Sequence, residues 1–203
     1  MESITFDNTI RFAKVRARVE CVETMEAMIF KFTESLGRRS QIEAVYYNSP
    51  SGVLKMRKYM HADNYGELLS YGKPVKKSYK YVGEMKYSTL ENSIETSSVL
   101  SFALGEKSTI NILRRQFEKD CIIINLDFVE GLGHFMSLKY ILDKCKDISD
   151  EDAVKTITDI MQQHFNYSKK DILPLGTYID LLKSNGLPDS DYDEEHTSDS
   201  SSI

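Results

Sequence analysis

Residues Thr9–Val19 alternate strictly between apolar and cationic side chains. Alanine and valine occupy one set of positions, whereas Lys14, Arg16 and Arg18 occupy the other. An alternation with period two over this length predicts a β-strand with one apolar and one charged face. The charged face fits either a solvated sheet surface or the wall of an anion-binding cavity, and this strand alone leaves both open.

The same pattern returns in Val53–Met60, where Lys55 and Arg57 share a face. Period-two patterns and turn residues predict the remaining strands at Glu43–Tyr47, Gly66–Tyr71, Lys77–Gly83, Thr109–Phe117, Cys121–Val129 and His134–Leu142. Helical spacing of apolar residues predicts helices at Glu23–Leu36, Leu90–Leu104, Glu151–His164 and around Ile179–Leu182. Gly37 is expected to end the first helix, with Arg38 and Arg39 in the following loop.

Two runs of antiparallel strands, each associated with helices, predict an α+β fold. We expect a closed, eight-stranded antiparallel β-barrel covered by helices, whose polar strand faces line a lumen. A water-exposed sheet usually mixes both signs of charge, whereas here one sign recurs on several strands. This repetition favours an anion-binding lumen.

The formal net charge of −5 is concentrated in the last sixteen residues. Residues Pro188–Ile203 contain six acids and neither lysine nor arginine. Removing those six acids leaves 25 acidic and 26 basic residues in Met1–Leu187, a net charge of +1. Residues 188–203 are therefore expected to form a disordered, Ser/Asp-rich acidic tail. The near-neutral body argues against non-specific nucleic-acid binding, and no specific nucleic-acid partner is expected.

Other features exclude further classes of protein. No apolar run approaches the roughly 18 residues that span a bilayer, and the N-terminus lacks the pattern of a secretory signal. The three cysteines, Cys21, Cys121 and Cys145, form no CxxC motif and are expected to be reduced thiols. We therefore expect an intracellular, cytoplasmic protein that does not enter a membrane. No histidine pair has the spacing of a zinc site.

Four segments resemble the CYTH family, the triphosphate tunnel enzymes, which include class IV adenylyl cyclases and thiamine triphosphatases. Ile124–Phe135 (INLDFVEGLGHF) resembles the family's strand-turn-strand segment, and Asn48–Arg57 (NSPSGVLKMR) resembles its serine-glycine turn and following strand. Gly66–Pro74 and Thr177–Leu182 are similar to two later family segments. The order agrees from about Thr9 to Leu182, so the resemblance assigns residues 1–187 to a CYTH-like tunnel domain.

The resemblance implies a tunnel in which basic side chains hold a triphosphate and carboxylates hold Mg²⁺ or Mn²⁺. This chain departs from that pattern at its carboxylates: Lys14, Ala44, Ser137 and Lys139 stand where the family carries acids. Asp127 remains, and is the one expected metal ligand if a metal binds. The expected anion-binding residues are Lys14, Arg16, Lys55, Arg57, Lys73, Arg115 and Lys139.

These substitutions predict a divergent, catalytically impaired CYTH protein, a pseudoenzyme without catalytic residues. It would bind a phosphate-like or triphosphate-like anion in its basic tunnel, or act as an interaction module. The alternative is an active metal-dependent phosphohydrolase or cyclase acting on thiamine triphosphate, inorganic triphosphate or ATP. Asp127, Glu43 or Glu118 would then have to supply metal ligands from altered positions.

Overall fold

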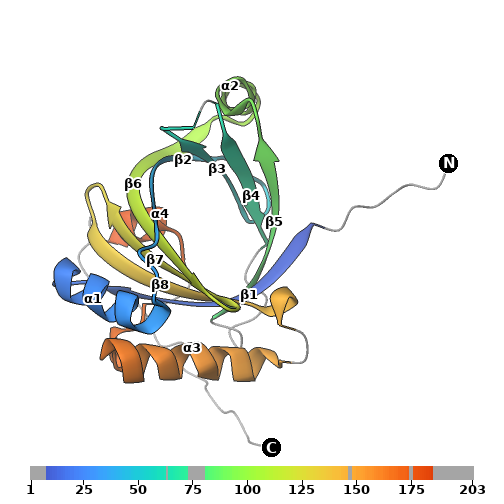
Figure 1. The fold of residues 1–203 in the computed structure, drawn as a ribbon. Helices are drawn as coiled ribbons and strands as arrows, with labels where there is room; N and C mark the ends of the chain where they lie inside the picture. Colours follow the sequence, from blue (N-terminus) through green and yellow to red (C-terminus); the bar gives the residue numbers. More distant parts are fainter. Residues whose placement is uncertain (1–7, 63, 73–80, 146–147, 174–175, 185–203) are drawn as a thin grey trace, which may run out of the picture.

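Eight antiparallel strands close into a barrel in the order β1-β5-β4-β3-β2-β6-β7-β8 (Figure 1). The computed structural model describes residues 8–62, 64–72, 81–145, 148–173 and 176–184. The strands are β1 (Thr9–Arg18), β2 (Arg38–Tyr47), β3 (Val53–Tyr59), β4 (Gly66–Tyr71), β5 (Val82–Leu90), β6 (Glu106–Lys119), β7 (Ile122–Val129) and β8 (Gly133–Ile141). The predicted α+β closed barrel is confirmed.

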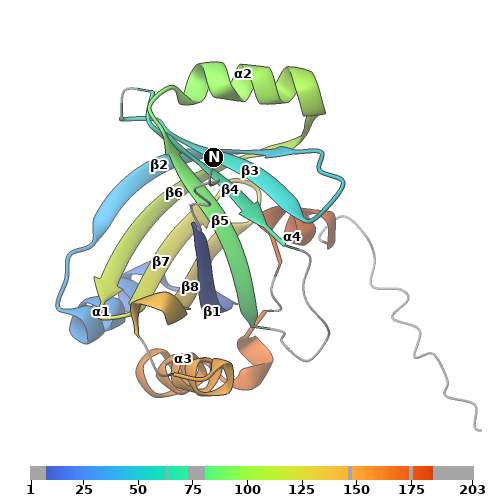
Figure 2. The same ribbon diagram turned by 90° about the vertical axis from the view of Figure 1, so that its right-hand side faces the viewer.

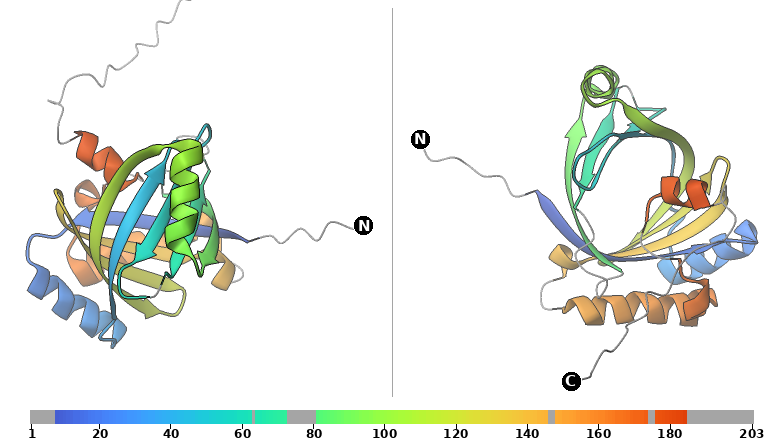
Figure 3. Two further views of the ribbon diagram at one scale, coloured as in Figure 1. Left: turned by 90° about the horizontal axis from the view of Figure 1, so that it is seen from above. Right: turned by 180° about the vertical axis from the view of Figure 1, so that it is seen from behind.

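Helices cover the barrel on two opposite sides (Figures 1 and 2). Helix α2 (Ser93–Leu104) crosses strands β2 and β3, whereas α1 (Val22–Thr33) and α3 (Asp150–Phe165) pack on the opposite side. A short helix, α4 (Tyr178–Ser184), lies beside β6 and β7 at the rim of the barrel (Figure 3). Within the described residues, no helix is long and apolar enough to cross a bilayer.

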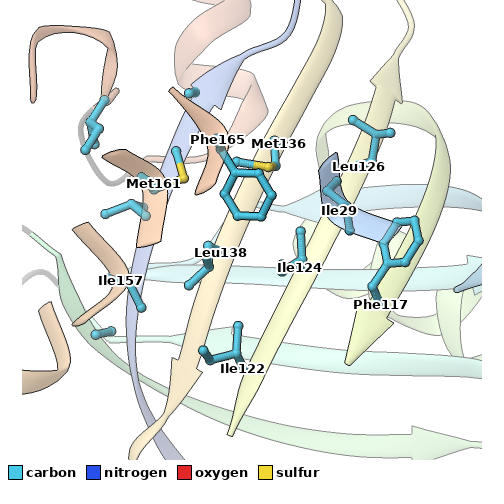
Figure 4. Close-up of a cluster of buried hydrophobic side chains, with 14 of the residues drawn as sticks. Ile29, Phe117, Ile122, Ile124, Leu126, Met136, Leu138, Ile157, Met161 and Phe165 are labelled. Atoms are coloured by element: carbon cyan, nitrogen blue, oxygen red, sulfur yellow. The ribbon is translucent and has the colours of Figure 1, made fainter. Parts of the chain in front are cut away.

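The main apolar core lies outside the barrel, between its wall and two helices (Figure 4). The outward faces of β1, β7 and β8 supply fully buried side chains such as Val15, Ile124 and Leu138. Ile29 from α1 and Ile157 from α3 pack against this wall. Because successive side chains on a strand point to opposite faces, burying the apolar face under helices directs the cationic face into the lumen.

The structure corrects some of the predicted boundaries. Helix α1 ends at Thr33, because Glu34 adopts a left-handed conformation with φ of 55° and ends the helix before Gly37. Gly37 instead leaves room for the ring of Phe117, because an added Cβ at this position would lie 2.8 Å from that ring. Arg38 and Arg39 begin β2 instead of forming a loop.

The predicted strand at Lys77–Gly83 lies largely outside the described residues. The strand observed in this region, β5, begins at Val82 and continues to Leu90. The following helix, α2, therefore begins at Ser93, three residues after the predicted start. Glu84–Ser88 alternate between polar and apolar side chains, so the sequence carried a strand signal that the predicted boundaries at Gly83 and Leu90 left out.

The expectation of three reduced thiols is wrong for one pair. Cys121, at the turn between β6 and β7, and Cys145, after the short turn that follows β8, form a disulfide with Cα atoms 6.2 Å apart. Cys21 remains a free, exposed thiol. A spacing of 24 residues carries no sequence signal of pairing, because the fold brings the two segments together.

Removing a core side chain of α3 tests whether this helix is part of the barrel's structural core. We expect Met161→Ala to lower the free energy of unfolding by about 2–5 kcal/mol, because Met161 is fully buried between α3 and the barrel. Gln162→Ala, at the neighbouring exposed position, should change it by less than about 0.5 kcal/mol. Urea denaturation of both variants measures the difference; equal effects would contradict the packing.

Candidate functional site

Strand register brings six cationic side chains into the lumen. On one wall, Lys14 of β1 lies directly opposite Lys139 of β8, and Arg16 lies opposite Ser137. Strand β3 contributes Lys55 and Arg57, which pair with Leu69 and Glu67 of β4. We call the six residues the lumen cations: Lys14, Arg16, Lys55, Arg57, Arg114 and Lys139.

Arg114 and Asp127 form a bidentate ion pair across β6 and β7. Arg114 donates from Nε to Oδ1 and from Nη2 to Oδ2 of Asp127, both at 2.7 Å. The hydroxyl of Tyr178, from α4, donates to the same Oδ2 at 2.7 Å. Burial alone would raise the pKa of Asp127, but the charge of Arg114 and these hydrogen bonds hold that pKa below its usual value.

Arg57 and Glu67 form the second ion pair inside the barrel. Nη1 of Arg57 lies 3.0 Å from Oε2 of Glu67, and the hydroxyl of Tyr59 donates to the same oxygen at 3.0 Å. Each of the two lumen carboxylates in the described part of the chain is therefore paired with one arginine and one tyrosine. The positive charges of Arg57 and Arg114 are thus balanced by these two carboxylates.

The other four lumen cations have no such compensation. Within the described residues, Lys14, Arg16, Lys55 and Lys139 form no salt bridge. Three of them lie over aromatic rings instead: Arg16 is 4.2 Å from the ring centroid of Tyr178, Lys55 is 4.9 Å from that of Tyr71, and Lys139 is 4.8 Å from that of Phe12. A cation–π contact neutralises no charge. The lumen therefore keeps an excess of four positive charges when its basic groups are all protonated.

The pKa values of the three buried lumen lysines lie below their usual value. Burial is the largest cause for all three lysines. The neighbouring cations add to it, and together they lower the pKa of Lys139 to about 7 and those of Lys14 and Lys55 well below their usual value. A bound anion would reverse this effect, because it stabilises the protonated lysines.

Two buried polar atoms in the lumen have no hydrogen-bond partner among the described residues: Nε of Arg16 and Oδ1 of Asn125. Both flank Ser137, which pairs with Arg16 on one side and Asn125 on the other. Buried polar atoms are usually satisfied, and unsatisfied ones in a native structure often mark a place for water or ligand. These atoms add a polar surface beside the uncompensated lysines.

Five of the seven predicted anion-binding residues lie in the lumen: Lys14, Arg16, Lys55, Arg57 and Lys139. The predicted inward orientation of Arg115 is wrong, since its side chain lies outside the barrel, 2.9 Å from Glu26 of α1, and donates to the carbonyl of Leu36. Its neighbour Arg114 points inward instead. Lys73 lies outside the described residues.

Glu67 was missed as a lumen residue by the sequence analysis. Its position two residues before Leu69 on β4 puts it on the inward face, opposite Arg57. Glu67, Leu69 and Tyr71 occupy alternate positions and therefore share one face of β4. The register between β3 and β4 was needed to show that this face points into the lumen. The predicted candidates Glu43 and Glu118 serve elsewhere: Glu43 pairs with Lys58, and Glu118 is an exposed residue near the end of β6 that accepts a hydrogen bond from Gln116.

The carboxylates present do not fit a divalent metal. Asp127 and Glu67 are already held by arginine, and a metal ion would have to displace a buried guanidinium to bind either one. Within the part of the chain that the structure describes, no cluster of three His, Cys, Asp or Glu side chains could hold a metal ion. The neighbouring lysines would repel a cation further.

A different feature lies on the outside of the barrel. Helix α2 exposes apolar side chains along its outer face: Ile94 is 63% exposed, Val99 is 66% exposed and Phe102 is 96% exposed. Apolar side chains gathered on one face are typical of interaction surfaces. The prediction of an interaction module therefore stays open beside that of an anion-binding lumen.

No family model matches the chain, and no curated protein matches it in sequence. Solved structures share its fold. A conserved hypothetical protein from Pyrococcus furiosus is 16% identical, with a TM-score of 0.70 over 84% of this chain and 99% of that one. A candidate adenylate cyclase from Vibrio parahaemolyticus is 18% identical, with a TM-score of 0.68 over 85% and 97%.

A candidate adenylyl cyclase from Hippeastrum, described with a dominant triphosphatase activity, is 11% identical. Its TM-score is 0.58, over 89% of this chain and 98% of that one. At these identities the likeness concerns the fold alone. The resemblance to the triphosphate tunnel fold that the sequence motifs predict is confirmed at this level.

Removing one buried lysine should stabilise the empty barrel. In the folded protein Lys139 loses its proton at about pH 7, whereas the unfolded chain keeps that proton to about pH 10.4. The unfolded state therefore binds more protons between these values, and stability rises with pH across this window. We expect Lys139→Met to raise the free energy of unfolding at pH 7 by about 1–3 kcal/mol and to flatten its rise with pH.

Denaturant titrations from pH 6 to pH 10 measure this effect. Lys86→Met is the matched control, because Lys86 is an exposed residue of β5. Its substitution should change neither the stability nor the pH dependence appreciably. A destabilised Lys139→Met variant at pH 7 would contradict an uncompensated charge at this position.

Breaking the Arg114–Asp127 pair should be strongly destabilising. Asp127→Asn keeps the shape of the side chain but leaves the charge of Arg114 buried and uncompensated, so we expect a loss of about 3–5 kcal/mol. Asp159→Asn, which breaks the exposed pair with Lys155, should cost less than about 1 kcal/mol. Thermal unfolding of both variants compares them, and similar losses would refute a structural role for the buried pair.

Proposed function

We propose that this chain, which has the fold of the triphosphate tunnel proteins, binds a phosphate-rich polyanion in its lumen without a divalent metal. The observation that carries the proposal is the excess of four positive charges left after both lumen carboxylates pair with arginine. Burying like charges without a partner is costly, so a lumen of this kind favours a ligand that neutralises them.

The charge of the lumen suits a free polyanion better than its metal complex. Tripolyphosphate carries roughly four to five negative charges near neutral pH, and lysine and arginine are the side chains that hold phosphate oxygens. In a metal-dependent tunnel, carboxylates would hold a divalent ion that offsets part of this charge. Here Lys14 and Lys139 already supply positive charge, so a metal is not needed for charge balance.

The proposal separates binding from catalysis. Hydrolysis or cyclisation of a triphosphate through a metal requires hard oxygen ligands that are free to bind it. The two lumen carboxylates have other partners, which supports a catalytically impaired protein. The alternative, a metal-dependent phosphohydrolase or cyclase on thiamine triphosphate, inorganic triphosphate or ATP, draws its support from the named activities of the fold's structural neighbours.

Isothermal titration calorimetry with tripolyphosphate tests the proposal. We expect binding in EDTA, and weaker apparent binding in excess Mg²⁺, because the metal complex carries less negative charge. Binding that requires Mg²⁺, or Mg²⁺-dependent release of phosphate that Lys55→Met abolishes, would support the enzyme instead. The absence of any binding at low salt would contradict the proposal.

A pair of variants on β3 tests whether the lumen is the binding site. Lys55→Met should weaken tripolyphosphate binding about 10- to 100-fold, the range for one hydrogen bond to a charged group. Lys58→Met removes the same charge from the opposite face of the strand, where Lys58 pairs with Glu43. This control should leave affinity within about twofold at moderate salt, where exposed charges are largely screened. Equal losses would indicate nonspecific attraction.

A further inference from the structure

Lys14 and Lys139 form an unusual pair at the junction of β1 and β8. They lie directly opposite each other in the antiparallel ladder, and both face the lumen. Like charges in directly opposed positions destabilise a sheet. No described carboxylate forms a salt bridge with either lysine. The pair is therefore a place where two positive charges converge without an ion-pair partner among the described residues.

The lumen is apolar on one side of this pair. The next inward residues on the same strands, Phe12 and Ile141, also oppose each other and are buried. They belong to an apolar cluster with Leu69 and Met85, which we call the apolar floor. The ring of Phe12 lies so close to Gly83 that an added Cβ would be 3.1 Å away. A phosphate chain gains no polar partner in this direction.

The next row on the other side of the pair is polar, and beyond it lies a second buried apolar cluster that includes Phe135 and Tyr178. The next pair along β1 and β8 is Arg16 and Ser137, followed across β7 by Asn125. Nε of Arg16 and Oδ1 of Asn125 are the two buried atoms without partners. An anion that touches the lysine pair therefore finds further polar partners in this row and none on the apolar floor.

From this asymmetry we infer that Lys14 and Lys139 bind the terminal phosphate of a linear phosphate chain. The inference rests on the proposed function and specifies its ligand class: anions with a free phosphate end, to the exclusion of cyclic metaphosphates. A terminal phosphate carries about 1.5 to 2 negative charges at pH 7, whereas an internal one carries about one. Two converging lysines match the former, and the apolar floor stops the chain at its end.

Capture of this phosphate is coupled to proton uptake. In the empty lumen, burial and the neighbouring cations lower the pKa values of both lysines, that of Lys139 to about 7. A dianion beside them raises those pKa values, so binding near pH 7 to 8 draws protons from the buffer. The charged groups that face the pair from the other strands are Arg16, Lys55, Arg57, Glu67, Arg114 and Asp127.

A comparison of linear tripolyphosphate with cyclic tetrametaphosphate tests the inference. Tripolyphosphate carries roughly four to five negative charges near neutral pH and cyclic tetrametaphosphate about four, but only the linear anion has ends. By calorimetry in EDTA, we expect the wild-type protein to bind the linear anion at least about tenfold more tightly. In buffers of different ionisation enthalpy, the linear anion should also show net proton uptake.

Lys139→Met tests the role of the lysine pair, because removing this buried charge is expected to leave the fold intact. It should lose the preference for the linear anion and most of the proton uptake, because its affinity for the linear anion falls more than its affinity for the cyclic one. Equal affinity of the wild-type protein for both anions, or an equal loss for both in the variant, would overturn the inference while leaving polyanion binding in place. Failure of both anions to bind the wild-type protein would overturn the proposed function as well.

Discussion

The alternation of side chains along a closed barrel wall is the constraint on which this structure depends. Helices α1 and α3 bury the apolar faces of β1, β7 and β8, and the same strands must then turn their polar faces inward. In a closed barrel, the face of a strand opposite to the helix-covered face must line the lumen. The alternation along β1 thus places Val15 under the helices and Lys14 inside the lumen.

The inward faces carry a charge balance that is only partly met. Two arginines pair with two carboxylates, each supported by a tyrosine hydroxyl, and these pairs make a fixed framework across β3–β4 and β6–β7. Among the residues that the structure describes, the remaining lumen lysines and Arg16 form no ion pair with an acid. A core selected for stability alone would replace such groups with apolar side chains, because buried charges without partners destabilise a fold. Their presence supports the proposed binding of a negatively charged ligand.

Local sequence patterns predicted the barrel and most of its inward faces, since period two is readable wherever charge and apolarity alternate. These patterns failed where two neighbouring residues could each be the one that faces the lumen. Arg114 and Arg115 both suit an inward position, and only the register with Asp127 decides between them. Glu67 and the disulfide between Cys121 and Cys145 depend on contacts between distant segments, which no local pattern encodes. The boundary of α1 depended on a left-handed Glu34, a conformation that the sequence favoured at Gly37.

The lumen lysines carry positive charge that no described carboxylate compensates through an ion pair. Nuclear magnetic resonance of the protein with ¹³C-labelled lysine Cε atoms measures the pKa of each ammonium group directly. The account predicts that Lys139 titrates at about pH 7 in the empty protein, with Lys14 and Lys55 also well below their usual value, and that tripolyphosphate shifts all three upward. Titration of every lysine near the ordinary value of about 10.4, unchanged by the anion, would contradict it.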